Sequence, residues 1–75
     1  MLVDIKIIDL DDRRYFKMLV SDYISLNQIQ SLLEVPQEYE MLVNGFYETN
    51  YYRLQPYDQI TFIIDPINKR IQNCN

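Results

Sequence analysis

Residues 41–64 read MLVNGFYETNYYRLQPYDQITFII and contain turns between β-rich runs. The pair Asn44-Gly45 tolerates positive φ, so we expect a strand over residues 39–43 to end there. Residues 46–48 then return as a short edge strand. Asp58 precedes residues 60–64, in which every side chain is β-branched or aromatic. That composition is typical of a central strand covered on both faces.

A hairpin is expected before this region. In residues 2–10, LVDIKIIDL, apolar side chains alternate with charged ones over most of the stretch, which is the pattern of a half-buried strand. Residues 9–14 are strongly charged and predict a turn. Residues 14–20, RYFKMLV, then form the returning strand.

A helix is expected to begin at Ser25. The stretch Ser25-Leu26-Asn27-Gln28 fits a capping box, in which the serine oxygen accepts from an amide of the first turn and Gln28 reaches back. Helical spacing assigns four side chains to the core and leaves the others, Gln30 among them, to solvent. The four are Leu26, Ile29, Leu32 and Leu33. Pro36 is expected to end the helix after about nine to eleven residues, because the position before a proline disfavours helical angles.

The expected elements follow the order strand, strand, helix, strand, short edge strand, strand. One helix packed on a mixed four- to five-stranded sheet makes a two-layer α+β domain. A hairpin, a helix and a return beside the first strand give the β-grasp arrangement, in which the first and last strands lie centrally and parallel. We expect this domain to cover residues 1–65 and residues 66–75 to form an exposed C-terminal tail.

The composition indicates a single folded domain. The chain has 75 residues, 48% hydrophobic and 24% charged, and this balance favours a globule over a disordered chain. Its net charge of −4 argues against nucleic acid or an anionic membrane as the main partner. We expect a protein partner with a basic face instead.

The compartment is expected to be the cytoplasm. Cys74 is the only cysteine, so an internal disulfide is excluded. The sequence contains no apolar stretch of transmembrane length. Its first residues lack the basic start and the long apolar block of a secretory signal.

From residue 24 to 64 the chain resembles the ubiquitin-like sulfur carriers of thiamine and molybdopterin biosynthesis. The resemblance rests on the leucine-containing helix from Ser25 to Leu33, on Leu42-Val43-Asn44-Gly45, and on the turn from Leu54 to Asp58 that leads into Ile60. It implies a β-grasp fold and docking onto a larger partner, such as an adenylating or cofactor-biosynthesis enzyme.

Two departures limit what this resemblance implies. Tyr57 stands where the family has glycine, so we expect ordinary backbone angles there, with Pro56 favouring a type I turn. The family's carriers also end in Gly-Gly, which must thread a narrow channel close to the nucleotide. Here no glycine follows Gly45, and the sequence ends in RIQNCN. We therefore expect the usual carrier chemistry to be absent.

We expect no enzyme, no metal site and no cofactor. Asp9, Asp11 and Asp12 lack the glycine-containing tight loop of a hard-cation site, and they predict a solvated turn. The chain contains no histidine, so no Cys–His pair can activate a thiol. Cys74 is either an incidental thiol or a reactive one on the tail, where the cations available to it are Lys69 and Arg70.

Aromatic residues provide the remaining candidate site. Seven tyrosines occur in the chain, and a group of aromatic side chains crowds its last turns. These are Phe46, Tyr47, Tyr51, Tyr52 and Tyr57. Because tyrosine anchors many protein interfaces, we expect this group to bind a partner protein, unless the rings only cover sheet edges and core. Two alternatives stay open, a sulfur carrier with an atypical terminus and a domain that self-associates through a strand edge.

Overall fold

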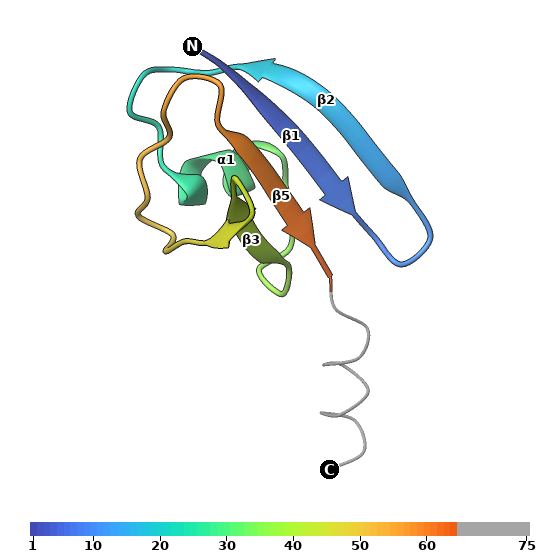
Figure 1. The fold of residues 1–75 in the computed structure, drawn as a ribbon. Helices are drawn as coiled ribbons and strands as arrows, with labels where there is room; N and C mark the ends of the chain where they lie inside the picture. Colours follow the sequence, from blue (N-terminus) through green and yellow to red (C-terminus); the bar gives the residue numbers. More distant parts are fainter. Residues whose placement is uncertain (65–75) are drawn as a thin grey trace.

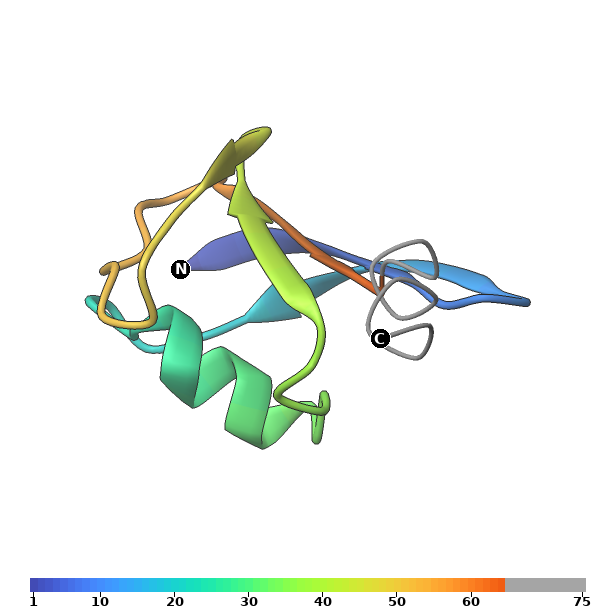
Figure 2. The ribbon, with the colours of Figure 1, turned by 90° about the horizontal axis from the view of Figure 1, so that it is seen from below.

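The computed structural model describes residues 1–64, in which one helix packs on one face of a five-stranded mixed sheet (Figures 1 and 2). The elements are β1 (Leu2–Ile8), β2 (Arg13–Leu19), α1 (Leu26–Leu32), β3 (Glu40–Val43), β4 (Phe46–Tyr47) and β5 (Gln59–Ile63). The strand order is β2-β1-β5-β3-β4. β1 and β5 are parallel neighbours, and the other adjacent pairs are antiparallel. The predicted α+β class and the parallel pairing of the first and last strands are confirmed.

The core lies between the sheet and α1. Along β1 the side chains of Val3, Ile5 and Ile7 are buried, and they join Leu26 and Ile29 of the helix in one cluster. The predicted alternation of β1 is therefore confirmed. Burial of each such aliphatic side chain contributes roughly 1.5–3 kcal/mol, and this contribution fixes which face of the sheet meets the helix.

β5 is central, as predicted, but it is not buried on both faces. Ile60 and Phe62 are fully buried, whereas Gln59, Thr61 and Ile63 are only half-buried. Figure 2 shows α1 on one side of the sheet only. The apolar run predicted a second covering layer that residues 1–64 do not supply.

The start of α1 agrees with the sequence. The Ser25 hydroxyl oxygen accepts from the Gln28 amide at 3.2 Å, and the Gln28 side-chain oxygen accepts from the Ser25 amide at 3.0 Å. The predicted capping box is confirmed. Two amides that the helix itself cannot satisfy are bonded in this way.

The end of α1 differs from the prediction. The helix ends at Leu32, because Glu34 adopts a left-handed conformation with φ of 57°. The Glu34 amide donates to the Ser31 carbonyl at 3.2 Å, and the Val35 amide donates to the Gln30 carbonyl at 3.0 Å. These two bonds form a Schellman motif with glutamate in the place usually taken by glycine. The helix thus stops before the influence of Pro36.

Two helix positions exchange their predicted roles. Gln30, expected in solvent, is only 2% exposed, and Leu32, expected in the core, is 62% exposed. Leu26, Ile29 and Gln30 occupy the i, i+3 and i+4 positions of one buried stripe. The Gln30 amide nitrogen donates to the Pro36 carbonyl at 3.0 Å. A buried amide therefore ties the helix to the loop that follows it.

The turn before β5 also differs from the prediction. Tyr57 has a φ of 67°, so ordinary backbone angles were the wrong expectation. The Asp58 amide donates to the Gln55 carbonyl at 3.1 Å, and a positive φ at the third residue is typical of a type II turn, not of type I. The Tyr57 amide donates to the Leu2 carbonyl at 2.8 Å. This contact with β1 helps to hold the turn in its left-handed form.

The predicted exposed tail, residues 66–75, lies outside the described residues. Within residues 1–64 no helix is long and apolar enough to cross a membrane.

Replacing Glu34 by glycine should stabilise the protein. A left-handed residue with a Cβ costs about 1–2 kcal/mol, and glycine removes this cost while adding about 0.5–1 kcal/mol of unfolded-state entropy. Glu34→Gly should therefore raise the free energy of unfolding by roughly 0.5 kcal/mol in urea titrations. Gln37→Gly is the control, since Gln37 is exposed and lacks a positive φ, and it should lower stability instead. Equal effects of the two substitutions would contradict this account of the helix end.

Candidate functional site

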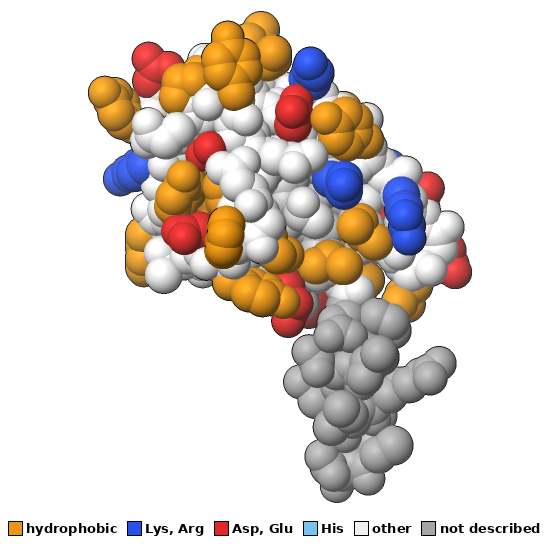
Figure 3. Space-filling model, in the orientation of Figure 1, with side chains coloured by type: hydrophobic (Ala, Val, Ile, Leu, Met, Phe, Trp, Pro, Cys, Tyr) orange, Lys and Arg blue, Asp and Glu red, His pale blue; other side chains and the backbone are white. Residues whose placement is uncertain are grey.

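The sheet face turned away from α1, here called the open face, is the candidate site. Its central row crosses all five strands and consists of Tyr15, Lys6, Thr61, Leu42 and Tyr47. At the usual spacing between strands this row is roughly 19 Å long. Figure 3 shows the open face without a covering layer in the described part of the chain. Such a face has the dimensions of a protein contact surface.

Exposed tyrosines stand at both ends of the central row. Tyr15 on β2 is 57% exposed and Tyr47 on β4 is 69% exposed. Tyr47 was predicted as a binding residue, whereas Tyr15 was missed. The signal for Tyr15 lies in the alternation of β2, which places it on the face opposite the half-buried Phe16. Only the strand register shows that Tyr15 and Tyr47 share one row.

Charge is distributed unevenly over the open face. Lys6, Arg13 and Lys17 belong to it and lie on β1 and β2 together with one acidic residue, Asp4, and Figure 3 shows the basic side chains concentrated on that side. On the opposite side the Tyr47 hydroxyl donates to the Glu40 carboxylate at 3.1 Å. The chain has a net charge of −4, yet the β1–β2 side of this face carries mainly basic side chains.

The five predicted aromatic residues do not form one surface. Phe46 and Tyr47 are consecutive residues of β4, so their side chains lie on opposite faces of the sheet. Tyr51 and Tyr57 are exposed on the loops before β5, and Tyr52 is half-buried against the core. Of the predicted group, Tyr47 alone belongs to the open face.

A buried carboxylate links the segments that carry these aromatic residues. Asp58 accepts from the Asn44 side-chain amide at 3.0 Å, from the Tyr52 hydroxyl at 3.1 Å and from the Gln55 backbone amide at 2.8 Å. Asn44 in turn accepts from the Gln59 amide at 3.0 Å. The turn before β4, the loop around Tyr52 and the turn before β5 are thereby held against one another.

Tyr52 is a structural residue as well as a predicted contact. Burial raises the pKa of Tyr52 above its ordinary value of 10.0, and both the hydrogen bond to Asp58 and the charge of that carboxylate raise it further. The neutral phenol is thus the form that the folded state favours. A substitution at Tyr52 consequently changes the fold and any binding together.

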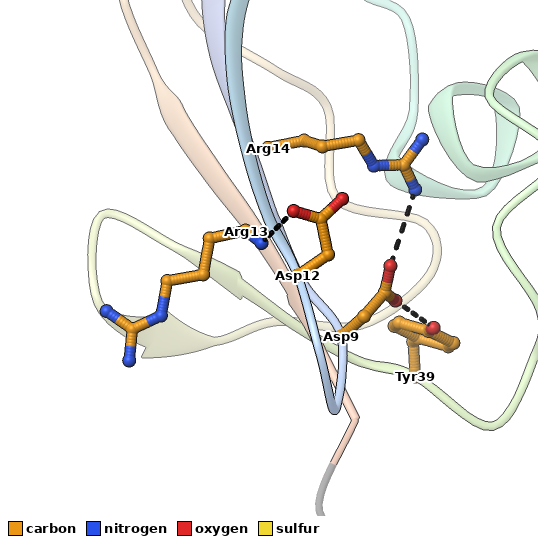
Figure 4. Close-up of polar contacts among 5 residues, drawn as sticks. All are labelled: Asp9, Asp12, Arg13, Arg14 and Tyr39. Carbon is orange, nitrogen blue, oxygen red and sulfur yellow. Dashed lines mark hydrogen bonds and ion pairs between the residues drawn. The ribbon is translucent and has the colours of Figure 1, made fainter.

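The acidic turn after β1 is only partly solvated. The Tyr39 hydroxyl donates a hydrogen bond to the Asp9 carboxylate, which also forms an ion pair with Arg14 at 3.7 Å (Figure 4). The Asp12 carboxylate accepts a hydrogen bond from the Arg13 backbone amide at 2.8 Å. The hydrogen bond to Asp9 is the largest influence that raises the pKa of Tyr39, ahead of burial. These contacts fasten the tip of the hairpin to the segment before β3.

Residues 1–64 contain no group of three or more His, Cys, Asp or Glu side chains that could hold a metal ion. The predicted reactive thiol, Cys74, lies outside the described residues, as do the neighbouring Lys69 and Arg70.

No family model matches this chain, and no curated protein matches it either.

Removing the Asp58 carboxylate should strongly destabilise the fold. Asp58→Ala leaves three donors near the core without their acceptor, and hydrogen bonds to a charged group contribute about 1.5–3 kcal/mol each. We expect a loss of roughly 3 kcal/mol in the free energy of unfolding, measured by urea denaturation. Asp11→Ala is the control, because Asp11 is exposed at the hairpin turn, and it should change stability by less than about 0.5 kcal/mol. Similar losses in both variants would contradict the role given to Asp58.

The protein should lose stability in alkaline solution, partly through Tyr52 and Tyr39. Their pKa values are raised in the folded state, so the unfolded state releases these protons first as the pH rises above 10.0. The stabilisation is fully present below pH 10.0 and decreases as the pH rises through the folded-state values.

The double variant Tyr39→Phe/Tyr52→Phe tests this pH dependence. Urea unfolding at several pH values between neutral and strongly alkaline should show a shallower alkaline decline than in the wild type. Tyr51→Phe removes one exposed hydroxyl and serves as the control. An unchanged alkaline slope in the double variant would show that neither phenol contributes.

Proposed function

We propose that this chain is a β-grasp module without catalytic function that docks onto a larger protein partner. The β-grasp assignment is supported by the element order, by the single helix on one sheet face within residues 1–64, and by the adjacent parallel β1 and β5. The proposal agrees with the resemblance to ubiquitin-like sulfur carriers, and it does not require the terminal chemistry of those carriers.

One observation carries the docking proposal, namely the uncovered row that ends in Tyr15 and Tyr47. Each of these rings is more than half exposed, and half-buried Thr61 and Leu42 lie between them. Tyrosine offers a large apolar ring together with a hydroxyl, so it gains contact area without losing its hydrogen bond. Aromatic residues of this kind are enriched in protein interfaces.

A protein surface is the ligand that fits this row best. Small molecules bind in concave pockets, whereas a row roughly 19 Å long across a sheet matches the dimensions of a contact between proteins. The mixture of acidic and basic side chains on the open face favours a partner with complementary charges over a uniformly charged polymer.

Three further exposed aromatic residues extend the proposed contact beyond the open face, two on the loops before β5 and one, Phe46, on the other face of β4. Phe46, Tyr51 and Tyr57 lie on segments that Asp58 holds close to the Asn44 turn and to the start of β5. In this proposal Tyr52 contributes mainly by positioning the loop, since its hydroxyl is bonded to Asp58. The partner thus contacts the open face and the adjoining loops near β4.

Alanine substitution of exposed tyrosines tests the proposed contact. The immobilised wild-type protein and the variants Tyr47→Ala and Tyr51→Ala are compared as baits in extracts of the source cells, with retained proteins quantified by mass spectrometry. We expect the wild type to retain at least one protein, and we expect Tyr47→Ala to retain roughly ten-fold less of it. Tyr52 is avoided because its loss would also disturb Asp58.

Tyr23→Ala is the matched control, because Tyr23 is an exposed tyrosine outside the open face. Equal retention of every partner by the wild type, Tyr47→Ala and Tyr51→Ala would refute the proposed surface. Sedimentation at increasing protein concentration accompanies the comparison. If the wild type forms a tight homodimer that Tyr47→Ala dissociates, the partner of this surface is a second copy of the chain and not a larger protein.

A further inference from the structure

β2 forms one edge of the sheet and offers seven residues without a strand on their outer side. The strand order places β2 at the end opposite β4, and its one partner among residues 1–64 is β1. An edge of this length presents backbone donors and acceptors to any extended chain that approaches it. Extended peptides commonly bind proteins by adding a strand to such an edge.

The pairing of β2 with β1 determines which backbone groups point outward. Met1 and Val20 exchange both hydrogen bonds, at 2.7 and 2.8 Å. In an antiparallel pair the bonded and non-bonded positions alternate, so the even-numbered residues of β2 bond to β1. The odd-numbered residues direct their amides and carbonyls away from the sheet. These are Arg13, Tyr15, Lys17 and Leu19.

One of the four outward amides already has a partner. The Arg13 amide donates to the Asp12 carboxylate at 2.8 Å (Figure 4). This contact closes the end of the edge next to the hairpin turn. Within residues 1–64 the outward amides of Tyr15, Lys17 and Leu19 remain for an added strand, and all three residues are exposed.

The side chains along this edge are basic, although the chain as a whole is acidic. β2 carries Arg13, Arg14 and Lys17, and Lys6 lies beside them on β1, directly opposite Tyr15. Among residues 1–64 Arg14 pairs with Asp9, while Lys6, Arg13 and Lys17 take part in no ion pair. Figure 4 shows the Arg13 and Arg14 side chains leaving the strand in opposite directions. The flank on the open face therefore has three basic side chains and one acidic neighbour, Asp4, which lies opposite Lys17 on β1, whereas on the other flank Arg14 is paired with Asp9.

We propose that the outer edge of β2 binds an extended acidic segment of another protein as an added antiparallel strand. Acidic residues of that segment lie opposite Arg13 and Lys17, and apolar residues lie opposite Tyr15 and Leu19. On the other flank an apolar residue lies opposite the half-buried Phe16. Backbone bonds supply part of the affinity, and the alternating charges supply the register.

A second copy of the chain fits this edge less well. Two β2 strands in which Tyr15 faces its own copy place Arg13 directly against Lys17, and the register centred on Lys17 places two lysines together. The register that pairs β2 over its full length, with Tyr15 opposite Lys17, avoids direct opposition. It still leaves Arg13 and Lys17 of the two copies on diagonals of roughly 7–8 Å. An acidic strand has none of these repulsions.

This edge shares the Tyr15 side chain with the row proposed above, but it binds through the outward backbone groups of β2, at the opposite end of the sheet from β4. The tests differ accordingly, because Tyr47→Ala examines the docking surface, whereas the comparison of Tyr15→Pro with Tyr15→Ala examines the backbone of the edge. The two proposals can therefore fail independently. Loss of peptide binding at β2 leaves the role of Tyr47 and the loops before β5 unchanged.

A synthetic peptide provides the direct test. The probe is Val-Ile-Glu-Val-Val-Glu-Glu with blocked ends, which in antiparallel pairing places glutamates opposite Lys17, Arg14 and Arg13 and valines opposite Tyr15 and Leu19. Titration into the ¹⁵N-labelled protein should shift the amide signals of residues 13–19 most strongly. A control peptide with lysine in place of each glutamate should bind at least roughly ten-fold more weakly.

Two pairs of variants separate charge from backbone pairing. Lys17→Glu should weaken binding of the acidic peptide by roughly ten-fold. Arg53→Glu makes the same charge change away from β2 and should have little effect on that binding. Tyr15→Pro removes one outward amide, which an edge strand tolerates. It should weaken binding clearly more than Tyr15→Ala, which loses the same ring and keeps the amide. Amide spectra of each variant establish that the fold is retained.

Several results would overturn the proposal. Equal binding of the acidic and basic peptides would exclude charge recognition, and equal binding by Tyr15→Pro and Tyr15→Ala would exclude strand addition. Shifts centred on β4 in place of β2 would place the acidic ligand elsewhere. Sedimentation of the wild type as a dimer that Tyr15→Pro dissociates would assign the edge to a second copy.

Discussion

The carboxylate of Asp58 is the interaction on which the loops of this protein depend. Its two oxygens accept from Asn44, Tyr52 and Gln55, which lie on three different segments of the chain. The Asp58 carbonyl also accepts from the Asp4 amide at 2.9 Å, at the start of the parallel pairing between β1 and β5. A charge with so little exposure is stable only when its oxygens have donors. The positions of these three loop segments are therefore mutually dependent.

Strained backbone positions show the same dependence on tertiary contacts. Within residues 1–64 five residues have positive φ, and Gly45 is the only glycine among them. Glu34 and Tyr57 carry side chains in a conformation that costs about 1–2 kcal/mol each. The Glu34 position is held by the Schellman bonds, and Tyr57 by its bond to Leu2. In a chain with so little glycine, the conformation of a turn depends more on the hydrogen bonds around it than on the residue type at the left-handed position.

This dependence explains which features the sequence could predict. The capping box at Ser25, the alternation of β1 and the turn at Asn44-Gly45 are local patterns, and the structure contains all three. Gln30 could not be assigned from its polarity, because its burial depends on a carbonyl that belongs to Pro36. The candidate site was predictable only at Tyr47, since its row is assembled by the register between strands that are distant in sequence.

The two edges of the sheet differ in a way that bears on recognition. β4 has only two residues, both aromatic, so it offers side chains and little backbone. β2 has seven residues, of which Arg13, Tyr15, Lys17 and Leu19 direct their amides outward, and its positive charges discourage pairing with an identical strand. The basic side chains of β2 repel a second basic strand and attract an acidic one, because the Coulomb energy changes sign with the charge of the added strand. In the proposed binding mode, the charges that disfavour pairing of two β2 strands therefore also select an acidic partner strand.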